Sequence, residues 1–108
     1  MAERLNIFEA TVEHFLAPIL PFLRDGAVSE VMINSADEIY VERNGQLVRT
    51  EAKFEDDEAL LAAVNNVLQY TGKRMDPEHP LIDSRLPDGS RVHVVLAPLC
   101  KSAAVMSI

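Results

Sequence analysis

The chain has 108 residues, 48% of them hydrophobic and 25% charged, which suffices for one small domain but not for two hydrophobic cores. The sequence has no run of about 18 apolar residues, the length that could span a bilayer. The net charge of −7 argues against nucleic acid as a partner. The one cysteine, Cys100, excludes an internal disulfide, so we expect a single cytoplasmic domain over residues 1–108.

The charge differs between two parts of the chain. Residues 1–72 carry five Lys/Arg against 13 Asp/Glu, a balance of −8, whereas residues 73–108 carry five against four, a balance of +1. A site for an anionic ligand is therefore expected in the second part, because the first part would repel such a ligand.

The first predicted element is a helix over residues 5–23. Its apolar residues recur at spacings of three and four, as on one face of a helix: Leu5, Phe8, Val12, Phe15, Leu16, Ile19 or Leu20, and Leu23. Pro18 and Pro21 disturb the second half of this pattern, so we expect a kink or an early stop there.

Three short strands are predicted next, over residues 28–34, 38–43 and 46–54. The dipeptide Asn44-Gly45 separates the second strand from the third, and this pair is a strong signal for a tight hairpin turn. The second and third strands are therefore expected to pair in antiparallel fashion.

A second helix begins at Asp56 or Asp57 as N-cap and continues to Tyr70, where Gly72 and two cations end it. A linker and further short strands follow: residues 75–80, then strands over 82–86, 91–97 and 104–108. The order of helix, three strands, helix and two or three strands predicts the α+β class rather than a series of βαβ units.

Two arginines flank the turn that Pro87-Asp88-Gly89 predicts, because proline presets φ and glycine accepts positive φ. The guanidinium groups of Arg85 and Arg91 would lie at the mouth of one hairpin, where they could converge on a single anion such as phosphate. The other interpretation is that the same arginines pair with Asp83 and Asp88 on a solvated hairpin.

Three blocks carry a resemblance to a known family: Val-Ser-Glu-Val-Met-Ile-Asn at 28–34, Glu-Ile-Tyr-Val-Glu-Arg-Asn-Gly-Gln-Leu at 38–47, and Pro-Leu-Ile-Asp-Ser-Arg-Leu-Pro-Asp-Gly-Ser-Arg-Val at 80–92. The chain resembles the N-terminal domain of the secretion-ATPase superfamily, which powers type II secretion, type IV secretion and type IV or tight-adherence pili. The order of the blocks is most similar to the tight-adherence (Cpa/Tad-type) branch. The resemblance covers nearly the whole chain and is most specific from Asp83 to Val92.

The resemblance implies an antiparallel sheet flanked by helices, of PAS-like shape. It implies that this domain covers ATP and Mg, held mainly by the C-terminal domain of a ring-shaped homo-hexamer, and that Arg85 and Arg91 contact the nucleotide phosphates. Rotation between the domains would couple hydrolysis to protein export or pilus assembly. The implied partners are the C-terminal ATPase domain of the same or an adjacent subunit and inner-membrane platform proteins, which would hold this cytoplasmic protein peripherally at the inner membrane.

One fragment, Thr71-Gly72-Lys73-Arg74, is not interpreted as a phosphate-binding loop. Val67 stands where that loop has its first glycine, Arg74 where it has serine or threonine, and the fragment ends a helix instead of beginning one. In the superfamily the Walker A loop belongs to the C-terminal domain, so we expect it beyond Ile108. The chain alone is expected to be inactive as an ATPase and to hold no catalytic residue.

Two other functional classes stay open. The first is a stand-alone PAS-like interaction or sensor module, and the second is a small enzyme in which His93 acts as the base and Asp83 is its orienting carboxylate. No metal site is expected, because the residues of the ligating types share no metal-ligand spacing: His14, His79, His93 and Cys100.

Overall fold

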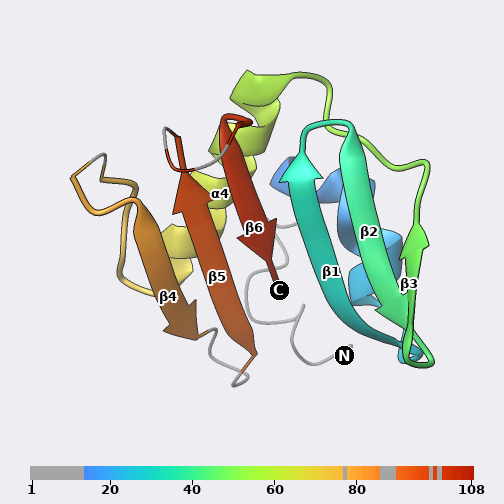
Figure 1. Ribbon diagram of the computed structural model, residues 1–108. Helices are drawn as coiled ribbons and strands as arrows, with labels where there is room; N and C mark the ends of the chain where they lie inside the picture. The colour runs from blue at the N-terminus through green and yellow to red at the C-terminus, as the bar shows by residue number, and fades with distance from the viewer. Residues whose placement is uncertain (1–13, 77, 86–89, 98, 100) are drawn as a thin grey trace.

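In the residues that the structure describes, six strands form one antiparallel sheet in the order β3-β2-β1-β6-β5-β4 (Figure 1). The computed structural model describes residues 14–76, 78–85, 90–97, 99 and 101–108, so the turn over 87–89, residues 5–13 of the first predicted helix and Cys100 lie outside this range. The strands are β1 (Val28–Ser35), β2 (Glu38–Arg43), β3 (Gln46–Arg49), β4 (Leu81–Arg85), β5 (Arg91–Leu96) and β6 (Ala104–Ser107). The predicted α+β class with an antiparallel sheet is confirmed.

The helices of this part of the chain lie against one face of the sheet (Figure 1). They are η1 (Ala17–Ile19), α3 (Leu20–Leu23) and α4 (Asp57–Tyr70). Pro18 and Pro21 each stand in the first turn of one of the two short helices, where a missing N–H costs least. The predicted interruption of the first helix is thus confirmed, because the helical residues His14 and Phe15 are followed by a bend at Leu16 and then by η1 and α3.

Both ends of α4 have the caps that the sequence predicts. The Asp56 carboxylate accepts a hydrogen bond of 2.8 Å from the backbone N–H of Ala59. At the other end Gly72 has a φ of 77°, its N–H donates to the Gln69 carbonyl at 3.2 Å, and the N–H of Lys73 donates to the Leu68 carbonyl at 3.1 Å. These bonds form a Schellman motif, which turns the chain sharply back toward the sheet.

The turn between β2 and β3 is the tight hairpin turn that Asn44-Gly45 predicts, with φ of 51° and 78°. The predicted length of the third strand is wrong, because β3 ends at Arg49 instead of Phe54. The hydroxyl of Thr50 donates to the Ile39 carbonyl at 2.9 Å and accepts from the N–H of Ala52 at 3.2 Å. The backbone N–H of Thr50 donates to the same Ile39 carbonyl at 2.9 Å, so pairing with β2 ends at Thr50, and the bond from Ala52 turns the chain after it. The other strand bounds agree with the prediction to within one residue.

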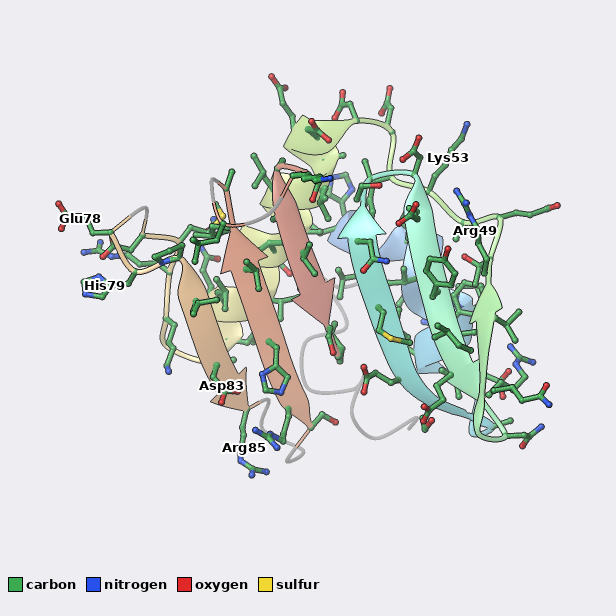
Figure 2. All side chains as sticks on the ribbon, viewed as in Figure 1. Arg49, Lys53, Glu78, His79, Asp83 and Arg85 are labelled. Carbon is green, nitrogen blue, oxygen red and sulfur yellow. The ribbon has the colours of Figure 1, made fainter. Side chains whose placement is uncertain are left out.

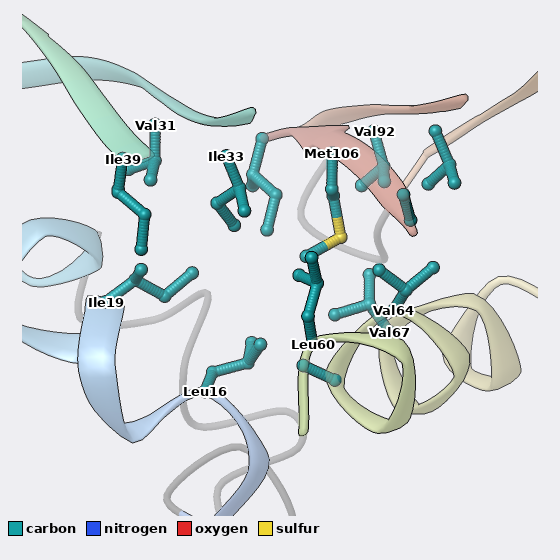
Figure 3. Close-up of a cluster of buried hydrophobic side chains, with 14 of the residues drawn as sticks. Leu16, Ile19, Val31, Ile33, Ile39, Leu60, Val64, Val67, Val92 and Met106 are labelled. Atoms are coloured by element: carbon teal, nitrogen blue, oxygen red, sulfur yellow. The ribbon is translucent and has the colours of Figure 1, made fainter. Parts of the chain in front are cut away.

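The hydrophobic core lies between the helices and the face of the sheet that they cover. Figure 3 shows Met106 of β6 reaching toward Leu60 of α4, and Ile19 of η1 lying beneath Ile39 of β2. All four side chains are fully buried, at 0% exposure. Burying a side chain of this size contributes about 1.5–3 kcal/mol, so η1 and α4 each stabilise the sheet that they cover. The opposite face of the sheet carries no helix of the described residues (Figure 1).

Candidate anion-binding site

Arg85 and Arg91 stand directly opposite each other in the register of β4 and β5. Both side chains belong to the exposed face of the sheet, and Figure 2 shows Arg85 projecting from the end of β4. Opposed residues in an antiparallel pair have Cβ atoms only about 4.5–5.5 Å apart, and like charges in such a pair destabilise it. The structure therefore brings the two predicted site residues together in a pairing that an anion would relieve.

Lys73 adds a third cation to this pair. Its Nζ donates a hydrogen bond of 2.7 Å to the backbone carbonyl of Asp83, so the lysine reaches from the end of α4 to β4. A surface cavity of about 310 Å³ is lined by Lys73, Asp83, Ser84, Arg85 and Arg91. Sequence reasoning missed this lysine, which it interpreted only as a cation at a helix end. The signal that could have found it is Gly72, whose left-handed conformation sends the chain back toward the sheet.

Asp83 is the acidic member of the cluster, and its carboxylate contacts two side chains of β5. One oxygen lies 3.0 Å from Nδ1 of His93, and the other lies 3.6 Å from a terminal nitrogen of Arg91. The interpretation that Arg91 pairs with Asp83 is thus confirmed in part. At 3.6 Å, with the two side chains 59% and 63% exposed, such a pair contributes little to stability. Asp88, the other proposed partner, lies outside the described residues.

A second cavity of about 270 Å³ adjoins the first and shares Lys73 and Asp83 with it. Its other lining residues come from the segment before β4 and from β4 itself: Arg74, Asp76, His79, Leu81 and Ile82. A hydrogen bond from His79, and second to it the backbone N–H of Glu78, lower the pKa of Asp76 below its ordinary value. Asp76, in the linker before β4, therefore stays ionised beside the first cavity, which the cations line.

The arrangement suits binding of an anion better than catalysis on its own. Guanidinium forks and an ammonium group recognise phosphate oxygens by charge-assisted hydrogen bonds. Over the described residues, no group of three or more His, Cys, Asp or Glu side chains is arranged to hold a metal ion. Within that same range, no helix is long and apolar enough to cross a membrane.

The sequence matches a family model described as "Type II/IV secretion system protein" over residues 13–105. It is 25% identical over 96 residues to the type IV secretion system protein VirB11 of Brucella suis, and 26% identical over 93 residues to the type IV secretion system protein PtlH of Bordetella pertussis. These alignments cover 89% and 86% of this chain but only 27% of each relative. The chain therefore spans about a quarter of the length of the curated relatives it matches.

A solved structure has the same fold. It is the crystal structure of the VirB11 ATPase from the Brucella suis type IV secretion system in complex with sulphate, which superposes with a TM-score of 0.78 at 23% sequence identity. The match covers 90% of this chain and 30% of the other. The six-stranded sheet with its helices on one face is thus an architecture that this ATPase also contains.

Proposed function

Since this chain belongs to the type II/IV secretion system protein family, as the resemblance of its sequence to the N-terminal domain of those ATPases predicted, we propose that it covers the nucleotide site of a C-terminal motor domain. In this role it couples ATP hydrolysis to protein export or pilus assembly. The motor is a homo-hexamer, and ATP and Mg are bound mainly by its C-terminal domain. Closeness to the tight-adherence branch stays a prediction.

Arg85 and Arg91 contact the nucleotide phosphates in this proposal, and Lys73 joins them from the end of α4. Positively charged donors held in advance around a transferring phosphoryl group stabilise the charge that spreads over its oxygens. The chain supplies these donors from two strands and a helix end, so their relative positions are fixed by the sheet and by the Schellman motif. The reaction itself needs the phosphate loop of the other domain.

The single observation that carries the proposal is the direct opposition of Arg85 and Arg91. Opposed like charges cost free energy, and Asp83 compensates Arg91 only in part, at 3.6 Å. An anion bound between the two guanidinium groups turns that cost into binding energy. The cavity of about 310 Å³ that they line with Lys73 has room for phosphate oxygens.

The proposed partners follow from the same role. They are the C-terminal ATPase domain of the same or an adjacent subunit, and platform proteins of a secretion or pilus machine at the inner membrane. The protein would then be cytoplasmic and held peripherally at that membrane. The names of the relatives, which are type IV secretion system proteins, support a machine of this kind.

The experiment that tests the proposal is ATP hydrolysis by the chain joined to its ATPase domain. Arg85→Ala should slow hydrolysis by about 10³-fold if the arginine acts as an arginine finger, and by less if it only positions the nucleotide. Arg85→Lys should rescue poorly, because lysine lacks the bidentate fork. The chain alone should release no phosphate from ATP.

Arg49→Ala is the matched control, because Arg49 is an exposed arginine of the other edge strand. It should leave hydrolysis unchanged. Replacing Arg85 should cost the chain less than about 0.5 kcal/mol of stability, as for ordinary surface changes. Normal hydrolysis by the Arg85→Ala and Arg91→Ala motors would disprove the phosphate contact and favour an interaction module instead.

A further inference from the structure

Asp83 contacts the cations of the anion site on two sides. Its carboxylate oxygen lies 3.6 Å from Arg91, and its backbone carbonyl accepts the hydrogen bond of 2.7 Å from Lys73. The carboxylate also lines the cavity of about 310 Å³ with these cations. A negatively charged group therefore stands inside a site whose other charged members are positive.

We propose that Asp83 is a positioning residue. Its carboxylate contacts Arg91 where a phosphate oxygen would otherwise bind, and it releases Arg91 when the anion binds. The inference rests on the proposed function, because it concerns the same site. In this role Asp83 keeps the Arg91 side chain over the cavity, and it also weakens binding of any anion that cannot displace it. The residue thus selects for anions of high charge, such as the phosphate groups of a nucleotide.

The geometry makes the exchange favourable for a doubly charged anion. The Asp83–Arg91 contact uses one oxygen at 3.6 Å between side chains that are 63% and 59% exposed, so it is a weak and screened ion pair. A phosphate or sulfate group offers several oxygens and twice the charge, and it can bond a guanidinium through two of its donors at once. A singly charged anion lacks this advantage over the carboxylate.

His93 contacts the carboxylate oxygen of Asp83 that does not face Arg91. Its Nδ1 lies 3.0 Å from the other oxygen of Asp83, and it stands opposite Asp83 on β4 and opposite Ser107 on β6. The charged groups around the ring are Asp83 and Arg85 from β4, Arg91 from its own strand, Lys73 through Asp83, and Glu30 of β1, whose carboxylate accepts a hydrogen bond of 3.3 Å from the Ser107 hydroxyl.

The test is a titration of the chain with sulfate, followed through backbone amide and arginine side-chain NMR signals at constant ionic strength. Asp83→Asn keeps the shape and an oxygen acceptor for His93 but removes the charge. It should tighten sulfate binding by about fivefold, which corresponds to about 1 kcal/mol for unit charges 4 Å apart in water.

Glu78→Gln is the matched control, since it removes the same charge from an exposed residue of the linker before β4. It should change the affinity by less than about twofold, because exposed charges are screened and Figure 2 shows Glu78 and Arg85 at opposite ends of β4. Unchanged amide signals elsewhere would verify that each variant is folded.

The outcomes separate this inference from the proposed function. Loss of sulfate binding in Arg91→Ala together with tighter binding in Asp83→Asn supports both. Loss in Arg91→Ala with unchanged or weaker binding in Asp83→Asn overturns the role of Asp83 and leaves the anion site intact. Sulfate binding that Arg85→Ala and Arg91→Ala do not weaken, or no sulfate binding by either the natural chain or Asp83→Asn, overturns the anion site and the inference with it.

Discussion

Two hairpins form the two edges of the sheet, and each contains a pair of arginines. In the β2–β3 hairpin, Arg43 stands opposite Gln46 and pairs with Asp25 at 3.1 Å, and Arg49 lies 6.0 Å from the centre of the Tyr40 ring. In the β4–β5 hairpin, the two arginines stand opposite each other. The arginines are therefore apart at one edge of the sheet and side by side at the other, where Arg91 also pairs with Asp83 at 3.6 Å.

The difference teaches that cross-strand pairing, and not the number of charges, locates the candidate site. Each arginine of the β2–β3 hairpin has a partner that explains it as part of the fold: a carboxylate for one and an aromatic face for the other. The arginines of the β4–β5 hairpin stand opposite each other beside Lys73, and the carboxylate of Asp83 compensates Arg91 only in part, at 3.6 Å. An anion would lower the cost of bringing these cations together.

The largest expected effect that would sharpen this comparison comes from two glycines with nearly the same backbone conformation. Gly45 of the β2–β3 turn has a φ of 78°, and Gly72 at the end of α4 has a φ of 77°. An alanine at either position should lower the free energy of unfolding by about 1–2 kcal/mol, because a Cβ atom strains the left-handed region. Urea denaturation measures both losses.

Only Gly72→Ala should also weaken sulfate binding, because the Schellman motif at Gly72 directs Lys73 to Asp83. Gly45→Ala is the control with matched strain at the other edge, where no cation of the site is held. Equal sulfate affinity in the two variants would contradict this expectation, because it would show that the end of α4 does not contribute to the anion site.

A smaller effect is expected from two double-mutant cycles, one at each edge. The Arg43–Asp25 pair, at 3.1 Å and partly buried, should have a coupling free energy of about 0.5–1 kcal/mol. The Arg91–Asp83 pair, at 3.6 Å and more exposed, should couple by less than about 0.3 kcal/mol. Alanine variants and urea denaturation supply both values. A stronger coupling at Arg91 would mean that this arginine is structural and not poised for an anion.

The smallest expected effect concerns Asp76 and His79, a second Asp–His pair that lies just before β4. Their contact of 2.9 Å lowers the pKa of Asp76, so this pair stabilises the fold above the ordinary pKa of an aspartate and loses that contribution as the pH falls through the lowered pKa. His79→Ala should raise the pKa of Asp76 toward its ordinary value, as a carboxyl carbon titration by NMR would measure. It should leave sulfate binding unchanged.

Much of the fold could be predicted from the sequence, because local signals agree with the tertiary structure. Asp56, Gly72 and Asn44-Gly45 each act through their own backbone, so their caps and turns are visible without any distant contact. The end of β3 could not be predicted, because pairing with β2 stops where the backbone N–H and the hydroxyl of Thr50 both donate to the Ile39 carbonyl, 11 residues away in sequence. The predicted strand extended to Phe54 because the prediction relied on strand propensity alone.

The site could be predicted only where its residues are close in sequence. Arg85 and Arg91 flank one turn, so a hairpin pattern brings them together. Lys73 reaches the site through the geometry of a helix end, and His93 through the register of β5, and neither has a spacing that marks a ligand. The role of the two arginines in contacting phosphate stays a prediction.

The position of β6 has a consequence for how the chain folds. This strand is the last of the described strands in sequence, yet it lies in the middle of the sheet, where Val31 and Ile108 exchange two backbone hydrogen bonds of 3.0 Å. The two edge hairpins close short loops, whereas joining them requires the whole intervening chain to be brought together. Contacts between residues so distant in sequence slow folding. We therefore expect that the two parts of the sheet become one when residues 104–108 pair between β1 and β5.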